Sequence, residues 1–159
     1  MEKKKVIEEL KQKFSEKIKG VPVQLGDEIL LIERDSLLDI VQFLKDKPYS
    51  YSMLLDLTCV DYKGQEPRFE MVYHLYSIPN VQRLRIKVSL SEKDLRIDSL
   101  ASLWKNANWL EREVFDMFGV DFKGHPDLKR IFMYDGFEGY PLRKDYPLRK
   151  RQPRIQLRK

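Results

Sequence analysis

The sequence predicts a two-layer α/β sandwich of the α+β type, with helices on one face of a mixed sheet. Two early segments carry apolar residues at helical spacing, and two later segments alternate apolar and polar residues. The expected order is helix, two strands, helix, three strands, then two short helices and an extended C-terminal segment. At 159 residues the chain is long enough for one domain with a buried core.

The first predicted elements are a helix over residues 2–19 and two short strands. Val6, Leu10, Phe14 and Ile18 recur at helical spacing, and Gly20 is a typical C-terminal stop. Residues 21–25 and 28–33 then form two strands across a turn at residues 26–27.

A second helix is predicted to begin at Asp35 or Ser36 and to end before Pro48. Its apolar stripe consists of Leu37, Ile40, Val41 and Leu44. The nearly continuous apolar run over residues 53–62 predicts a central strand. Residues 69–75 and 84–90 alternate, and the turn at residues 79–80 joins them as a hairpin.

Two short helices are predicted next. The first starts at Asp98 or Ser99 and runs through Trp104, and the second is capped by Asn108 with Glu111 as its capping-box partner. Gly119 is expected to end the second helix in the left-handed conformation. The core domain therefore covers residues 1–122.

Residues 123–159, here called the strap, are basic, punctuated by Pro and Gly, and rich in aromatic residues. From Pro141 to Lys159 there are eight cations against the single acid Asp145. Apolar anchors on an extended basic segment predict a strap that orders by packing on a partner subunit. The alternative is a strap that packs on its own domain.

The cysteine count limits the cofactors. Cys59 is the only cysteine, whereas an iron–sulfur cluster takes about four thiolates. No Gly-rich loop has the spacing of a dinucleotide or phosphate site. We therefore expect no cofactor and no metal in this chain. No apolar run is long enough to span a membrane, and residues 1–5 do not begin a secretory signal.

The predicted helix over residues 109–118 carries four charges. Leu110, Val114, Met117 and Phe118 share one apolar stripe. Glu111 and Glu113 flank this stripe on opposite sides, about 200° apart, which excludes a carboxylate dyad. Arg112 and Asp116 are expected to pair at i,i+4.

A metal or acid–base site at Glu113 and Asp116 is conceivable, but no histidine lies on this helix to complete it. We instead expect Glu111 and Glu113 to be partly desolvated and to need cationic partners. The candidates are Lys129, Arg130, Arg143 and Lys144. His125 precedes a proline and is expected to fix its loop by hydrogen bonding.

Residues 111–132, EREVFDMFGVDFKGHPDLKRIF, resemble the signature of the 30-kilodalton subunit family of respiratory complex I, which includes the C subunit of bacterial NADH:quinone oxidoreductase. Residues 107–109 and 138–148 also resemble the family pattern. The candidate structural and interface residues are Asn108, Trp109, Glu111, Arg112, Glu113, Asp116, Met117, Phe118, Gly119, His125, Lys129, Arg130, Ile131, Gly139, Tyr140, Pro141, Arg143, Lys144, Asp145, Tyr146 and Pro147.

This resemblance implies a structural subunit without a catalytic residue or redox centre, which binds the 49-kilodalton (D) subunit and other subunits of the hydrophilic arm. Flavin, iron–sulfur clusters and quinone would belong to the partner subunits. This chain would be peripheral, on the cytoplasmic side of the cell inner membrane, as part of a membrane complex. Related membrane-bound hydrogenases and other donor:quinone oxidoreductases use a similar subunit, so the signature leaves the electron donor open. The pI of 9.2 also suggests nucleic-acid binding, but the strap has no RNA-binding motif.

Overall fold

The structure is a computed structural model that describes residues 3–20, 22–24, 27–149 and 151–152. Its elements in chain order are α1 (Lys3–Lys13), the 3-10 helix η1 (Ser15–Lys17), β1 (Ile18–Gly20), β2 (Val23–Gln24), β3 (Asp27–Ile32), the 3-10 helix η2 (Arg34–Ser36), α2 (Leu37–Lys45), β4 (Met53–Asp61), β5 (Phe69–Ser77), β6 (Gln82–Leu90), β7 (Arg96–Asp98), α3 (Ala107–Phe118) and β8 (Asp121–Lys123). In this described part of the chain, no helix is long and apolar enough to cross a membrane.

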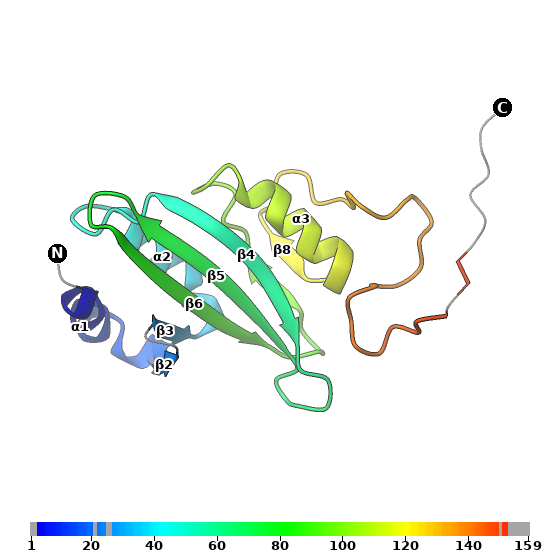
Figure 1. Cartoon of the computed structure of the whole chain (residues 1–159), viewed down its shortest axis with the longest axis horizontal. Coiled ribbons are helices and arrows are strands. Elements are labelled where there is room, and N and C mark those ends of the chain that lie inside the picture. The colour runs from blue at the N-terminus through cyan, green and yellow to red at the C-terminus, as the bar shows by residue number, and fades with distance from the viewer. Residues whose placement is uncertain (1–2, 21, 25–26, 150, 153–159) are drawn as a thin grey trace.

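The main sheet has the order β1-β3-β6-β5-β4, and β2 pairs with β3 outside this path. The β3–β6 pair is parallel, whereas β4–β5 and β5–β6 are antiparallel, so the sheet is mixed. Figure 1 shows α2 behind the long strands. Val6 and Leu10 of α1 and Ile40 of α2 are buried in one core with Leu30 and Ile86 of the sheet. The predicted fold class is confirmed.

The alternating segments form the predicted hairpin, and this hairpin occupies the centre of the sheet. Phe69, Tyr73 and Leu75 of β5 are fully buried, and so is Ile86 of β6. The hairpin turn lies between Ser77 and its partner Gln82. Alternation identified these strands because the helices cover only one face of them.

The helix α2 also follows its predicted pattern. All four apolar residues of its stripe are fully buried. The helix ends at Lys45, before Pro48, and Ser36 occupies the N-cap position without a capping bond from its side chain.

The strand β4 is an edge strand, so its predicted central position is wrong. Met53 and Leu55 are 41% and 42% exposed, which shows that its apolar run is divided between the core and the surface. The indole of Trp104 donates to the Ser52 carbonyl (3.0 Å) and the Asn106 amide donates to the Leu54 carbonyl (2.8 Å). These bonds occupy carbonyl groups at the start of the edge strand.

The first helix ends earlier than predicted, at Lys13. Ile18 pairs with Ile32 in β1, because strand pairing is available to these residues once β3 lies beside them. Gly20 is therefore the last residue of a strand. The predicted strands over residues 21–25 and 28–33 correspond to β2 and β3, with residues 21, 25 and 26 outside the described part.

The predicted helix from residue 98 to residue 104 is also wrong. Asp98 lies in β7, which pairs in parallel with β8 at Lys123, and turns follow up to α3. The apolar spacing arose because Leu100 and Trp104 are buried within these turns. The N-cap of α3 is Asn106 rather than Asn108, and Glu111 forms no capping box with it.

Candidate functional site

The helix α3 buries charged residues both beside its apolar stripe, at Glu111, and on the opposite side, at Arg112 and Asp116. Val114, Met117 and Phe118 are buried in the core, as predicted. Glu111 and Asp116 are also fully buried, and Arg112 is nearly so. A helix with both sides buried must satisfy its charges inside the protein.

Asp116 binds the main chain of the strap. Its Oδ2 accepts hydrogen bonds from the N–H groups of Ile131 (3.1 Å), Phe132 (2.8 Å) and Met133 (2.9 Å). Its Oδ1 forms a 2.8 Å ion pair with Arg130. Burial alone would raise the pKa of Asp116, but the three N–H groups and Arg130 outweigh it and hold the pKa below its usual value.

Arg112 binds the same turn of the strap. Its guanidinium donates to the carbonyls of Lys129 (3.1 Å) and Arg130 (3.4 Å) and lies 4.9 Å from the centre of the Trp109 ring. The predicted i,i+4 pair of Arg112 with Asp116 is therefore wrong. Each of the two side chains instead reaches outward to the strap, where main-chain carbonyls accept from Arg112 and main-chain N–H groups donate to Asp116.

Glu111 joins α3 to the turn that precedes it. Its carboxylate accepts from the Ser99 hydroxyl and from the Leu100 N–H, both at 2.6 Å. His125 Nε2 lies 3.9 Å from Glu111 Oε2. Burial raises the pKa of Glu111 to about 7, although the two donors oppose this shift. The predicted cationic partners Lys129, Arg143 and Lys144 do not bind it.

His125 fixes its loop, in agreement with the prediction. Its Nδ1 accepts from the Asp127 N–H at 3.0 Å, which places the ring proton on Nε2. Nε2 then donates to the Asn108 carbonyl at 3.1 Å.

The C-terminal end of α3 binds the next part of the strap. Gly119 ends the helix with φ +77°, as predicted. A Cβ at this position would lie 2.5 Å from the Tyr140 ring. Arg143 donates to the Phe118 carbonyl (2.6 Å) and lies 5.2 Å from the centre of the Phe69 ring. A cation at a helix C-terminus is electrostatically favourable.

A buried ion-pair network forms the third contact with the strap. Arg68 donates to both oxygens of Asp61 at 2.8 Å and also binds Asp145 (2.7 Å) and Glu92 (2.6 Å). The Lys144 N–H donates to Asp61 at 2.7 Å. The hydrogen bond from Arg68 is the main cause that lowers the pKa of Asp61.

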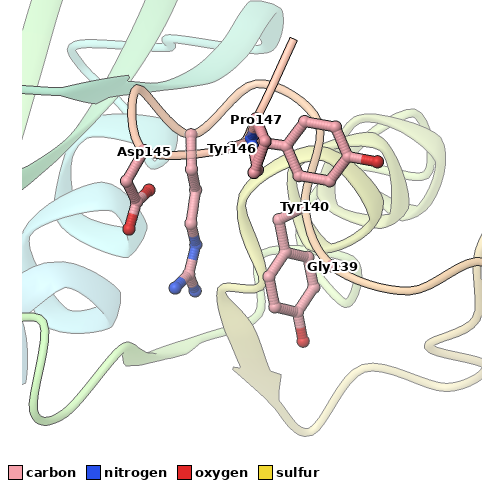
Figure 2. A pocket seen from close by; sticks show the side chains of 6 residues that line it. Gly139, Tyr140, Asp145, Tyr146 and Pro147 are labelled. Atoms are coloured by element: carbon pink, nitrogen blue, oxygen red, sulfur yellow. The ribbon is translucent and has the colours of Figure 1, made fainter. Parts of the chain in front are cut away.

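The strap itself forms a hollow of about 220 Å³, whose lining side chains are drawn in Figure 2. It is lined by Gly139, Tyr140, Arg143, Asp145, Tyr146 and Pro147. The rings of Tyr140 and Tyr146 extend beside it from the same loop. The Gly139 carbonyl accepts from Arg130, so this loop is connected to the Asp116 contact.

The side chains of four other predicted residues make no polar contact within the site. Glu113 is exposed, so its predicted desolvation is wrong. Lys129 pairs with Asp127 at the surface. Lys144 contributes its main chain to the site. Pro141 is partly buried, with no polar contact of its side chain.

Beyond the contacts of Lys123 with Asp98 and of His125 with Asn108, the described strap residues thus contact their own domain at three places: the Asp116 carboxylate, the end of α3 and the Arg68 network. The boundary expected between residues 122 and 123 falls within β8. Figure 1 shows the segment beyond β8 running out past α3.

Sequence reasoning missed Asp61, Arg68, Glu92 and Ser99. These residues lie outside the signature, in segments that only the fold brings to α3 and the strap. An arginine seven residues after an aspartate, across the turn between two strands, was the one available signal for the Asp61–Arg68 pair.

The fold and the site together define a class: an α+β domain whose buried charges bind its own C-terminal segment. The family model described as "Respiratory-chain NADH dehydrogenase, 30 Kd subunit" matches residues 30–152. The chain belongs to this family.

Two relatives and one solved structure illustrate the similarity. The C subunit of NADH-quinone oxidoreductase from Geobacter sulfurreducens is 48% identical over 148 residues, which cover 92% of this chain and 91% of the relative. The C/D subunit of NADH-quinone oxidoreductase from Proteus mirabilis is 43% identical over 91% of this chain but only 25% of the relative. The trypsin-resistant fragment (1–134) of Nqo5 has a TM-score of 0.67 at 32% identity and covers 79% of this chain and 98% of the fragment.

Proposed function

We propose that this chain is a structural, non-redox subunit of the peripheral arm of a proton-translocating NADH:quinone oxidoreductase. In this role it supports electron transfer from NADH to quinone by binding the 49-kilodalton (D) subunit. Flavin, iron–sulfur clusters and quinone are then held by partner subunits, and this chain lies on the cytoplasmic side of the cell membrane as a peripheral part of the membrane complex. The names of the relatives support NADH as the donor.

The observation that carries this proposal is that three charged residues of α3 are buried and bind other segments of the chain. Glu111, Arg112 and Asp116 are buried, and each is hydrogen-bonded to another segment of the chain. A reacting group needs access to a substrate, whereas these groups are buried and take up their hydrogen-bonding capacity within the chain. Their arrangement supports a role in holding the strap in a fixed conformation.

The single cysteine also supports a non-redox role. Cys59 is buried on the core side of β4. Burial raises the pKa of its thiol to about 12, so it stays protonated and is a poor metal ligand. A cluster would in any case need about three further thiolates.

Binding to the D subunit is supported by the fused relative. In the Proteus mirabilis protein, a region similar to this chain makes up a quarter of a polypeptide whose name joins the C and D subunits. Fusion keeps two domains at high local concentration, which favours an interface between them. The strap offers exposed apolar side chains for such contacts, including Phe132, Leu142 and Leu148.

Two measurements test the proposal. The purified chain, prepared without oxygen, should contain neither iron nor flavin. The native complex, captured from membranes through this chain and identified by mass spectrometry, should contain the D subunit and the flavin-bearing and cluster-bearing NADH subunits. Stoichiometric iron or flavin on the isolated chain, or a captured complex without the D subunit, would overturn it.

A further inference from the structure

Two neighbouring side chains of α3 face away from the protein. Trp109 is 62% exposed, and Glu113 is also exposed. Residues four apart on a helix lie on the same face, with Cβ atoms about 6 Å apart. An indole ring and a carboxylate therefore stand side by side on the first two turns of α3, at the end of the molecule that also carries the strap (Figure 1).

The fold does not account for these two residues. Their neighbours Glu111, Arg112 and Asp116 each bind another segment of the chain. The Glu113 carboxylate makes no ion pair or hydrogen bond within the described residues. An exposed tryptophan is unusual, because this residue is costly to leave in water and is enriched at the centres of protein interfaces.

The chemistry of the pair indicates what it binds. A carboxylate attracts a cation, and an indole ring is the best aromatic surface for a cation. Arg112 already lies over the Trp109 ring and is itself buried, so it fixes the ring from the side of the protein. The exposed indole and Glu113 then remain free to contact one incoming side chain at the same time.

We propose that Trp109 and Glu113 form a docking site for an arginine or lysine side chain of the D subunit. The inference rests on the proposed function for the identity of the partner and on charge complementarity for the chemistry of the contact. Glu113 is the only carboxylate on α3 that the fold leaves unpaired among the described residues. It therefore favours an orientation of the interface in which a basic side chain of the partner meets this face of α3.

The surrounding contacts explain why this site would be preorganised. Arg112 and Asp116 both bind the strap turn at residues 129–133, so the helix is held on the side next to Trp109. A rigid aromatic anchor binds with a smaller entropic cost than a mobile one. Phe132, whose N–H binds Asp116 on this side of the helix, is also exposed.

The test measures binding of the purified full-length chain to the purified D subunit by calorimetry. Trp109→Ala and Glu113→Lys should each weaken binding about tenfold or more, the loss that is typical of an interface hot spot. Ile78→Ala and Glu16→Lys are the matched controls, because both residues are exposed on other elements, and they should bind as the unaltered chain does. Raising the salt concentration should reduce the effect of Glu113→Lys more than that of Trp109→Ala.

The outcomes distinguish a failure of the docking site from a failure of the proposed function. If the unaltered chain binds the D subunit and both variants bind equally well, the docking site is wrong while the proposed function stands. If the unaltered chain does not bind the D subunit, the proposed function fails and the docking site falls with it. If circular dichroism shows that Trp109→Ala is unfolded, Glu113→Lys alone decides. A D-subunit variant with one surface Arg or Lys changed to Glu should restore binding to Glu113→Lys.

Discussion

Arg68 Nη2 donates a 2.7 Å hydrogen bond to Asp145, and this ion pair joins two residues that are 77 positions apart. Arg68 is buried because it also binds Asp61 at the end of β4, whereas Asp145 is about half exposed. The Arg68–Asp145 pair therefore connects the strap to the core. Asp61 does not need Asp145, because Arg68 neutralises Asp61 directly.

Asp145→Asn should release this part of the strap while the core stays folded. The neutral side chain loses most of its attraction for Arg68, but the Asp61–Arg68 pair remains. Because Asp145 is substantially solvated, the loss in unfolding free energy should be small, about 1 kcal/mol or less. Limited proteolysis with trypsin should cut after Lys144 or Arg149 faster than in the unaltered chain.

Asp135→Asn is the control, since this exposed strap carboxylate lies outside the Arg68 network. Equal cutting rates for Asp145→Asn and the unaltered chain would mean that the Arg68 contact does not hold the strap.

Glu111 should make the stability depend on pH. Its pKa is raised from 4.5 in the unfolded chain to about 7 in the folded protein. Folding therefore favours the protonated form of Glu111. Its contribution to the unfolding free energy is complete below about pH 4.5 and is lost as the pH rises through 7. This shift in the pKa corresponds to a change in the unfolding free energy on the order of 3 kcal/mol.

The measurement is the unfolding free energy from pH 5 to 8, compared between the unaltered chain and Glu111→Gln. The difference isolates Glu111 from the nearby groups His125 and Tyr73, which both proteins retain. Glu111→Gln should gain stability relative to the unaltered chain as the pH rises. Parallel curves would show that Glu111 is already ionised at pH 5.

Asp116→Ala should destabilise the protein strongly. The change leaves Arg130 and three strap N–H groups without their acceptor. Removal of one partner from a buried pair costs about 3–5 kcal/mol. Chemical denaturation should show this loss, together with faster proteolysis of residues 129–133.

Glu113→Ala is the matched control on the same helix. Its side chain is exposed, so the unfolding free energy should change by about 0.5 kcal/mol or less. A similar loss for the two variants would show that the Asp116 contacts contribute nothing specific.

A sequence pattern predicts those elements of this fold that have a local period. The hairpin of β5 and β6 and the stripe of α2 were predictable because each has a local period and one buried face. The edge position of β4 was not predictable. A continuous apolar run is expected both for a strand that lies between two other strands and for an edge strand that packs against a helix.

The candidate site shows the same limit. The charged residues of α3 and the strap were identified as a set, but their partners were assigned by charge alone. Asp116 and Arg112 in fact bind main-chain groups of the strap, which no side-chain pattern reveals. Arg68 entered the site through tertiary contacts with a strap 77 residues away.

Gly119 and Gly124 offer a matched pair of substitutions at the two ends of β8. Both have a positive φ, +77° and +79°, so an alanine at either position carries a similar backbone cost of about 1 kcal/mol. They differ in their surroundings. A Cβ at Gly119 would lie 2.5 Å from the Tyr140 ring and 2.8 Å from the Arg143 guanidinium, whereas a Cβ at Gly124 meets nothing within 4 Å.

Gly119→Ala should therefore cost about 1–3 kcal/mol more than Gly124→Ala, because the ring and the guanidinium must move away from the end of α3. Thermal unfolding of the two variants gives the difference, and trypsin cleavage after Arg143 or Lys144 reports whether the strap is displaced. Displacement of Arg143 also removes its hydrogen bond to the Phe118 carbonyl. Equal losses in the two variants would mean that Tyr140 and Arg143 are not held against Gly119, and that the strap leaves the end of α3 without cost.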